Sequence, residues 1–301
     1  MYFKNVIEAL GHTPLVELSQ MSPNKKVKIL AKLEGQNLGG SASIKDRIAR
    51  YMIEQAERSG ELTKDKTIIE ATSGNTGIAL AWLGRKKGYK VTIVMPDSMS
   101  LERRQLLKIF GAELILTKGA LGMPKAIATA REMAAKDKKY FIPDQFSNPV
   151  NPLAHYETTA VEIISDFPYE RIDVLVAGIG TGGTLMGIAR RFREKYPHIR
   201  AIGLEPPLGD SIQGLKCLGE ELPPFWDPSL FTEKTIVTGQ QAEEATSQLL
   251  EKEGIFAGPS SGAVVHQAVK VAAEMGEGNI VAVLADAGWK YLSVAPWSKA
   301  K

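Results

Sequence analysis

The fold of this 301-residue chain is decided by the stretch Gly178-Ile179-Gly180-Thr181-Gly182-Gly183-Thr184. The stretch follows an apolar run at residues 172–177 and precedes a helical pattern at residues 185–192. A strand that enters a glycine-rich turn and then a helix leaves backbone N–H groups without partners at the positive end of the helix dipole. Such a turn binds an anion, usually a phosphate. The stretch therefore predicts a phosphate site inside a βαβ unit.

Strand-like and helical patterns alternate along most of the sequence. The strands are short, rich in Val and Ile, and apolar without strict alternation, as in strands covered on both faces. The expected strands are residues 29–33, 67–71, 90–95, 113–116, 174–177, 201–204, 234–238 and 280–284. The expected helices are residues 45–58, 75–87, 100–110, 124–135, 183–195, 241–253 and 262–275. This order predicts an α/β fold with parallel sheets, and prolines at 143, 149 and 152 indicate a crossing between two lobes.

Composition excludes several classes of function. The net charge of +3 is small and no basic run carries interleaved aromatics, so a nucleic-acid partner is not expected. No apolar run approaches the roughly 20 residues that span a bilayer, so no membrane partner is expected, and the first residues lack the features of a signal peptide. One cysteine, Cys217, and four histidines without metal-like spacing predict no metal site. We expect a cytoplasmic protein in which Cys217 and the histidines have packing or surface roles.

The glycine-rich turn alone fits two kinds of ligand. Read literally, Gly178, Gly180 and Gly183 match the dinucleotide fingerprint, and Glu205 ends the next strand where a ribose-binding acid would lie. The hydroxyls of Thr181 and Thr184 instead suit a terminal phosphate monoester, which carries nearly two charges. Other turns must decide between these two ligands.

Three further turns carry polar groups at the start of helices. Residues 72–77 offer N–H groups, hydroxyls and an amide that suit a carboxylate. Lys45 begins a helix, where the helix dipole disfavours a positively charged side chain. A lysine at this position makes sense if its amine is neutral or bonded to a carbonyl carbon. Ser260 lies in a small-residue turn before the last expected helix. Each turn alone has an ordinary structural explanation, but together they are the parts needed to hold pyridoxal phosphate and an amino acid.

At these turns the sequence resembles the cysteine synthase family, within the fold-type-II pyridoxal-phosphate enzymes. The resemblance runs nearly end to end. It is carried by residues 11–16, 32–34, 43–47, 70–77, 145–149, 180–184, 260–263 and 291–293. It implies two lobes, each with a mostly parallel twisted sheet flanked by helices, as in the β-subunit of tryptophan synthase. It also implies a larger cofactor-phosphate domain, residues 1–35 and 148–301, and a smaller mobile domain, residues 36–147. On this resemblance the dinucleotide reading, and with it the ribose role of Glu205, is set aside.

The resemblance also implies a role for each turn. Lys45 would form the Schiff base with pyridoxal 5′-phosphate, and Ser260 would face the ring nitrogen. Asn75 would bind the 3′-oxygen of the ring. The phosphate would be held by Gly180, Thr181, Gly182, Gly183 and Thr184, and the substrate carboxylate by Thr72, Ser73, Gly74, Asn75, Thr76 and Gln145.

The implied reaction is a β-replacement through an aminoacrylate, catalysed by a homodimer. O-acetyl-L-serine and sulfide would give L-cysteine. Residues 95–104 are most similar to B-type cysteine synthases, which can also accept thiosulfate and then form S-sulfocysteine. Lys216 lies near where a basic residue of that branch would help to bind such an anion. Alternatives are a cystathionine β-synthase, a serine or threonine dehydratase, an O-phosphoserine sulfhydrylase and a non-catalytic regulator with this fold.

Two departures from the family pattern bear on these expectations. Leu38 replaces a proline, and the spacer before Ser43 is about two residues longer than usual. We expect the helix that starts at Lys45 to be kept and the loop before it to bulge. Residues 286–289, Asp-Ala-Gly-Trp, replace a small polar turn near the cofactor ring.

Overall fold

The computed structural model describes residues 1–72, 74–98, 101–219 and 222–299. The chain forms two compact units, one of residues 1–10 and 38–150 and one of residues 11–37 and 151–301. The first ten residues were expected in the larger domain but belong to the unit of residues 38–150. Their attachment has a physical cause, because Arg50 Nη1 donates a hydrogen bond to the carbonyl oxygen of Ile7 (3.0 Å) and Ile7 packs against that unit's core.

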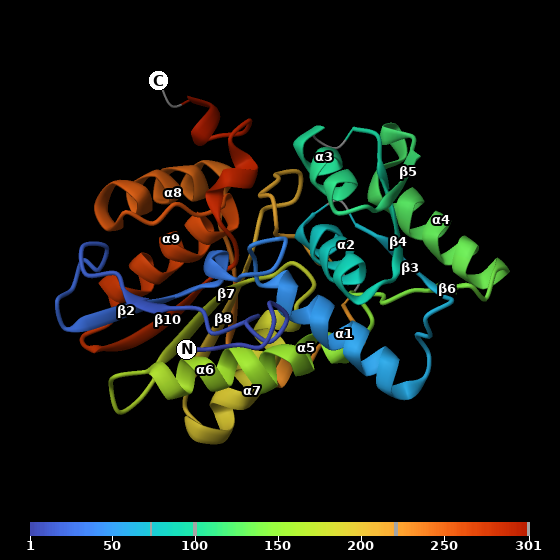
Figure 1. Cartoon of the computed structure of the whole chain (residues 1–301). Helices are drawn as coiled ribbons and strands as arrows, with labels where there is room; N and C mark the ends of the chain where they lie inside the picture. Colours follow the sequence, from blue (N-terminus) through green and yellow to red (C-terminus); the bar gives the residue numbers. More distant parts are fainter. Residues whose placement is uncertain (73, 99–100, 220–221, 300–301) are drawn as a thin grey trace. The chain divides into compact units, whose positions relative to one another are not determined.

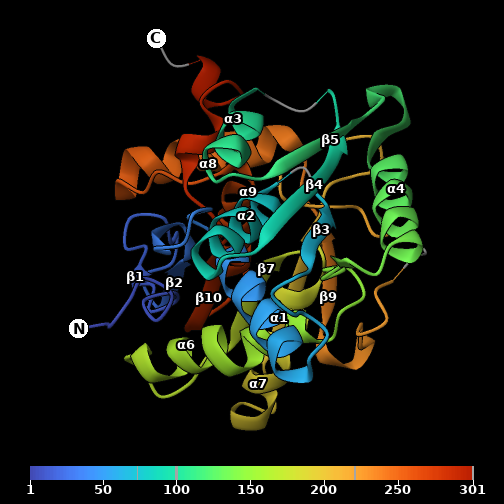
Figure 2. The ribbon, with the colours of Figure 1, turned by 45° about the vertical axis from the view of Figure 1, so that its right-hand side comes forward.

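The unit of residues 1–10 and 38–150 contains a four-stranded parallel sheet with the order β5-β4-β3-β6. Figure 2 shows α4 on one side of this sheet and α2 and α3 on the other. The strands are β3 (Thr67–Ala71), β4 (Lys90–Pro96), β5 (Glu113–Thr117) and β6 (Tyr140–Phe141). The helices are α1 (Lys45–Ser59), α2 (Asn75–Lys87), α3 (Leu101–Ile109) and α4 (Gly122–Lys136).

The unit of residues 11–37 and 151–301 contains a six-stranded sheet with the order β1-β2-β10-β7-β8-β9. All neighbours are parallel except β1 and β2. Figure 1 shows α8 and α9 on one side of the central strands and α6 and α7 on the other. The strands are β1 (Leu15–Glu17), β2 (Val27–Leu33), β7 (Val174–Gly178), β8 (Arg200–Glu205), β9 (Glu233–Ile236) and β10 (Gly278–Leu284). The helices are α5 (Val150–Ala154), α6 (Ala160–Asp166), α7 (Gly183–Lys195), α8 (Gly239–Glu253) and α9 (Pro259–Glu274), with a π-helical turn at His155–Thr159.

The expected α/β architecture is confirmed, and each expected strand and helix is present with ends that differ by a few residues. The short strands β1 and β6, which have three and two residues, and the helical segment of residues 150–166 were not predicted. The prolines that crowd this region concealed the segment. Pro152 lies in the first turn of α5, where a proline removes no helical hydrogen bond. Among the described residues no helix is long and apolar enough to cross a membrane.

A buried ion pair anchors the segment that leads into β1. Lys32 in β2 is 0% exposed, and its Nζ lies 2.9 Å from Oε2 of Glu162 and donates a hydrogen bond to the carbonyl oxygen of Thr13. Glu162 in turn accepts hydrogen bonds from the backbone N–H groups of His12 (2.9 Å) and Thr13 (3.3 Å). His12 has a φ of 51°, an uncommon conformation for a residue with a side chain. The Lys32–Glu162 pair therefore neutralises two charges and also holds the strained turn at His12 and Thr13 in place.

Candidate functional site

The glycine-rich turn between β7 and α7 has no room for side chains at two of its glycines. A Cβ at Gly180 would lie 2.8 Å from the carbonyl oxygen of Gly214, closer than real Cβ contacts allow. Gly182 has a φ of 86°, in the left-handed region that favours glycine, and precedes the first residue of α7. The turn therefore presents backbone N–H groups at the start of a helix, together with the hydroxyls of Thr181 and Thr184. This donor set fits a phosphate monoester, so the residues present fit the phosphate of pyridoxal phosphate.

A second loop, residues 212–218, lies against this turn. The backbone N–H of Lys216 donates to the carbonyl oxygen of Ile179 (2.8 Å). A Cβ at Gly214 would lie 3.1 Å from Oγ of Ser260, so the same loop approaches the serine expected at the ring nitrogen. Residues 212–215 were not predicted to be part of the site. In this unit the structure thus brings together the phosphate turn, Ser260 and the loop that carries Lys216.

Ser260 is buried in the first turn of α9, and a small polar cluster lies beside the residues that precede it. The backbone N–H of Gly258 donates to the carbonyl oxygen of Asp286 (3.1 Å), and a Cβ at Gly258 would collide with the Asp286 side chain. The Tyr291 hydroxyl donates to Oδ2 of Asp286, and Nζ of Lys290 lies 3.7 Å from the same oxygen. Asp286 is thus a buried support for the turn before Ser260.

The helix that carries the candidate Schiff-base lysine begins as expected. Lys45 is the first residue of α1, and its backbone N–H donates to Oγ of Ser43 (3.1 Å). The side chain of Asp46, which is buried, accepts hydrogen bonds from the backbone N–H groups of Ser41 (3.1 Å) and Ser43 (3.0 Å). Ala42, in the loop before Lys45, has a φ of 42°, an uncommon conformation for a residue with a side chain. Asp46 organises this loop. No role was predicted for it, although an acidic residue in the first turn of a helix is a usual stabilising feature.

The loop after β3 holds the other candidate groups of the same unit. Asn75 and Thr76 begin α2, and the Thr76 hydroxyl donates to Oε1 of Gln145 (2.6 Å). This bond joins two residues that are far apart in the sequence and are both predicted to bind the substrate carboxylate. The N–H of Gly74 donates to Oγ1 of Thr72 (3.3 Å), which closes the turn. Ser73, also predicted to bind the substrate, lies outside the described residues.

A buried acidic residue, Glu70, lies next to the backbone of Gln145. Glu70 in β3 is 3% exposed, and its carboxyl group lies close to the backbone of Asp144 and Gln145. Asp144, the residue before Gln145, has a φ of 47°, an uncommon conformation for a residue with a side chain. Desolvation by burial, followed by the nearby charge of Asp144, raises the pKa of Glu70 from 4.5 to about 8.

The raised pKa of Glu70 predicts a pH dependence of stability. Between pH 4.5 and about 8 the unfolded chain loses this proton while the folded chain keeps it, so stability falls as pH rises. Below pH 4.5 and above about pH 8 the group has the same charge in both states and its contribution is constant. Glu70→Gln removes the titration. Across this range the free energy of unfolding of the variant, relative to that of wild type, should therefore rise by a few kcal/mol, at about 1.4 kcal/mol per pKa unit.

Urea unfolding of the cofactor-free proteins at pH 5, 7 and 8.5 measures this difference. The matched control is Glu61→Gln, which changes an exposed glutamate of the same unit and should track wild type. Parallel pH profiles for Glu70→Gln and wild type would contradict the assignment.

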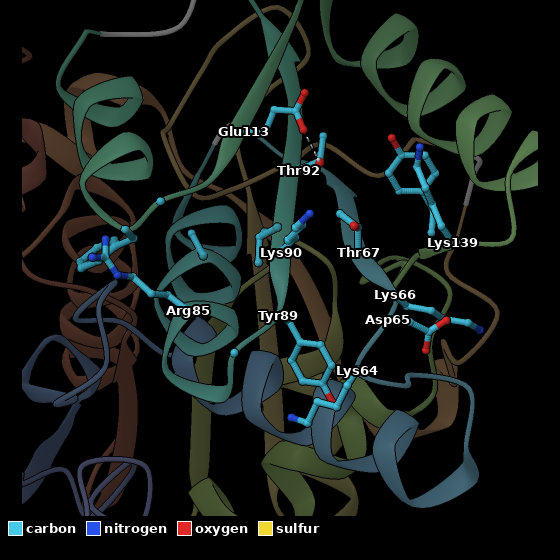
Figure 3. Close-up of a pocket in the computed structure, with 16 residues that line it drawn as sticks. Lys64, Asp65, Lys66, Thr67, Arg85, Tyr89, Lys90, Thr92, Glu113 and Lys139 are labelled. Carbon is cyan, nitrogen blue, oxygen red and sulfur yellow. Dashed lines mark hydrogen bonds between the residues drawn. The ribbon is translucent and has the colours of Figure 1, made fainter.

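A separate pocket of about 990 Å³ lies in the same unit at the amino ends of the strands (Figure 3). Thr67 and Lys90, the first residues of β3 and β4, line it, whereas the loop with Asn75 follows the carboxyl end of β3. Most of its basic side chains are bonded within the protein. Lys64 donates to the Lys87 carbonyl oxygen, Lys66 to that of Glu61 and Arg85 to that of Ile109, and Lys139 pairs with Asp137. Because the pocket lies at the amino ends of the strands, it is distinct from the predicted carboxylate site at their carboxyl ends.

Glu205 and Cys217 contact each other and stabilise the loop of residues 212–218. Glu205 is buried, accepts a hydrogen bond from the N–H of Leu218 (3.2 Å) and lies 2.9 Å from Nζ of Lys234. The thiol of Cys217 is directed at Oε1 of Glu205 at 3.9 Å. Glu205 thus braces the loop of residues 212–218. Within the described ranges no group of three His, Cys, Asp or Glu side chains is placed to hold a metal ion.

The chain is similar to known pyridoxal-phosphate dependent enzymes. A family model described as pyridoxal-phosphate dependent enzyme matches residues 6–286. Cysteine synthase of Staphylococcus aureus is 41% identical over 303 residues, which cover 98% of this chain and 97% of that protein. The crystal structure of O-ureido-L-serine synthase is 38% identical with a TM-score of 0.92, covering 98% of this chain and 95% of its own. Cysteine synthase of Entamoeba histolytica is 37% identical with a TM-score of 0.91, covering 100% of this chain and 92% of its own.

Proposed function

This chain belongs to the family of pyridoxal-phosphate dependent enzymes, and we propose that it is a cysteine synthase that forms L-cysteine from O-acetyl-L-serine and a sulfur donor. The observation that carries the proposal is the position of Lys45 as first residue of α1, directly after the hydrogen-bonded Ser43 turn, in a chain so similar to cysteine synthases. Pyridoxal phosphate, when bound, supplies the electron sink that allows an α-proton and a β-leaving group to depart.

Lys45 has two proposed tasks. Its Nζ would hold the cofactor, and its amine would serve as the base that takes up the α-proton of the substrate and returns it to the product. Lys45 is half-buried, and Asp46 holds the backbone of the loop before it.

The remaining residues are proposed to bind and orient the cofactor and the substrate. Gly180, Thr181, Gly182, Gly183 and Thr184 hold the phosphate. Ser260 meets the ring nitrogen with a hydroxyl, which, unlike a carboxylate, does not hold a proton there and so favours prompt loss of the β-group over transamination. Asn75 binds the ring oxygen. Thr72, Ser73, Gly74, Asn75, Thr76 and Gln145 bind the substrate carboxylate.

A product assay tests this function. Purified protein loaded with pyridoxal phosphate is given O-acetylserine with sulfide, thiosulfate or homocysteine, and in other arms O-phosphoserine with sulfide or serine alone. We expect cysteine from O-acetylserine and sulfide. Cystathionine as the main product, keto acid from serine alone, or preferred use of O-phosphoserine would assign one of the related activities instead. No turnover with any substrate would indicate a regulator without catalysis.

We further propose that Lys216 favours an anionic sulfur donor, thiosulfate. Its support is the hydrogen bond that places the Lys216 backbone against the phosphate turn. Lys216→Ala should lower kcat/KM for thiosulfate about tenfold more than kcat/KM for sulfide, because a hydrogen bond to a charged group is lost. Steady-state kinetics with both donors measures this ratio, and Lys252→Ala, an exposed lysine of α8, is the control. An equal loss for both donors would contradict the proposal.

We also propose a homodimer in the cytoplasm, as the family resemblance implies. Light scattering of the cofactor-loaded protein should give twice the mass of one chain, and the mass of a single chain would contradict the dimer.

A further inference from the structure

Two fully buried side chains lie beneath the threonine hydroxyls of the phosphate turn. Asn151 in α5 and His155 in the π-helical turn are both 0% exposed. Nδ2 of Asn151 donates to Oγ1 of Thr181 (2.9 Å), and Nε2 of His155 lies 3.3 Å from Oγ1 of Thr184. The residues that contact the two hydroxyls therefore come from the segment that sequence analysis missed, and His155 has a polar partner as well as a packing role.

After its hydrogen bonds within the protein, the Thr181 hydroxyl can make one more hydrogen bond. A hydroxyl has two acceptor lone pairs and one donor proton. Oγ1 of Thr181 accepts from Nδ2 of Asn151 and from the backbone N–H of Gly183 (3.3 Å), so both lone pairs are used. The group that remains for a ligand is the O–H donor.

His155 can produce the same result at Thr184. Nδ1 of His155 lies 3.0 Å from Oγ1 of Thr159, one turn later in the π-helical segment, and Nε2 faces Thr184. If Nε2 carries the proton, it donates to Thr184, whose own O–H is then left as a donor, while Nδ1 accepts from the Thr159 hydroxyl. In the opposite tautomer Nε2 would accept the Thr184 proton, and the turn would lose a donor.

We propose that Asn151 and His155 are positioning residues that fix both threonine hydroxyls as donors, with His155 held neutral and protonated on Nε2. This inference rests on the proposed function and names how the site selects the cofactor's phosphate. A phosphate monoester dianion presents only acceptor oxygens, so a turn whose hydroxyls can only donate matches it.

Binding measurements separate this role from simple packing. Cofactor-free wild type, His155→Leu and Asn151→Leu are titrated with pyridoxal phosphate and with pyridoxal, which lacks the phosphate. We expect each variant to bind pyridoxal phosphate at least about tenfold more weakly and pyridoxal within about twofold of wild type. His155→Gln, whose amide retains a donor, should recover part of the loss. His198→Leu, which changes an exposed histidine, is the control.

Equal weakening for both ligands, or no weakening for either, would overturn the inference. Should the leucine variants fail to fold, the comparison uses His155→Gln and Asn151→Asp, which keep the shape of the side chain or nearly so. A wild-type protein that forms cysteine while these variants keep full affinity for pyridoxal phosphate overturns the positioning role and leaves the proposed function intact.

The tautomer can be read without any ligand. Histidine labelled with ¹⁵N gives different nitrogen shifts for a protonated and an accepting ring nitrogen, and the His155 signals are those that vanish in His155→Gln. A protonated Nε2 with an accepting Nδ1 supports the inference. The reverse pattern, or protonation of both nitrogens, overturns it, whatever the outcome of the activity assay.

Discussion

Lys45→Ala should reduce the rate of cysteine formation by at least about 10³-fold, the largest effect expected of any single substitution in this chain. The change removes both the covalent attachment of the cofactor and the proposed base for the α-proton. The loop around residue 45 is held by backbone hydrogen bonds to Ser43 and Asp46, which the variant keeps. We therefore expect the fold to be retained, and the initial rate with O-acetylserine and sulfide measures the loss.

The control for this substitution is Lys90→Ala. Lys90 is the exposed first residue of β4, at the end of the sheet opposite the carboxylate loop. It should keep the wild-type rate. If Lys45→Ala keeps more than a tenth of the wild-type rate, then Lys45 is neither the attachment point nor the base.

Lys32→Met should lower the free energy of unfolding by about 3 kcal/mol, because removal of one partner leaves a charge uncompensated in a poorly solvated site. The variant loses the 2.9 Å contact with Glu162 and the hydrogen bond to the Thr13 carbonyl oxygen. Glu162 must still accept the N–H groups of His12 and Thr13, so the strained turn that they form loses support. Urea unfolding of the cofactor-free variant and wild type gives the difference directly.

The chain offers a matched control on the same strand. Lys28 and Glu17 form an ion pair at the same distance, 2.9 Å, with side chains 40% and 34% exposed. Lys28→Met should cost less than about 1 kcal/mol, because water solvates the remaining charge. Similar losses for Lys28→Met and Lys32→Met would show that burial does not govern the cost.

The order of strands and helices was predictable because it depends on local patterns. Apolar runs such as β7 and β10 stand between amphipathic segments, and glycines such as Gly88, with a φ of 81°, end helices where the pattern stops. The segment of residues 150–166 was not predictable in this way. Its prolines suggest a loop, and its helical path, including a π-helical turn, is stabilised by buried contacts such as that of His155.

The candidate site was predictable where polar residues stand at the start of a helix and not where support comes from elsewhere in the chain. The start of α1 at Lys45 was expected and is confirmed, and Thr76 and Gln145, both predicted to bind the substrate carboxylate, contact each other. Glu70 and Asn151 gave no signal, because their partners are residues brought close only by folding. Lys32 lies in a strand-like run in which sequence alone gives no reason to bury a charge.

The most direct test of the account is to find where the cofactor is attached. The protein loaded with pyridoxal phosphate is reduced with borohydride, digested and mapped by mass spectrometry, with Lys45→Ala treated in parallel. A pyridoxyl group on Nζ of Lys45 in wild type, absent from the variant, is the predicted result. A pyridoxyl group on another lysine, or none on a protein that still makes cysteine, would contradict the account.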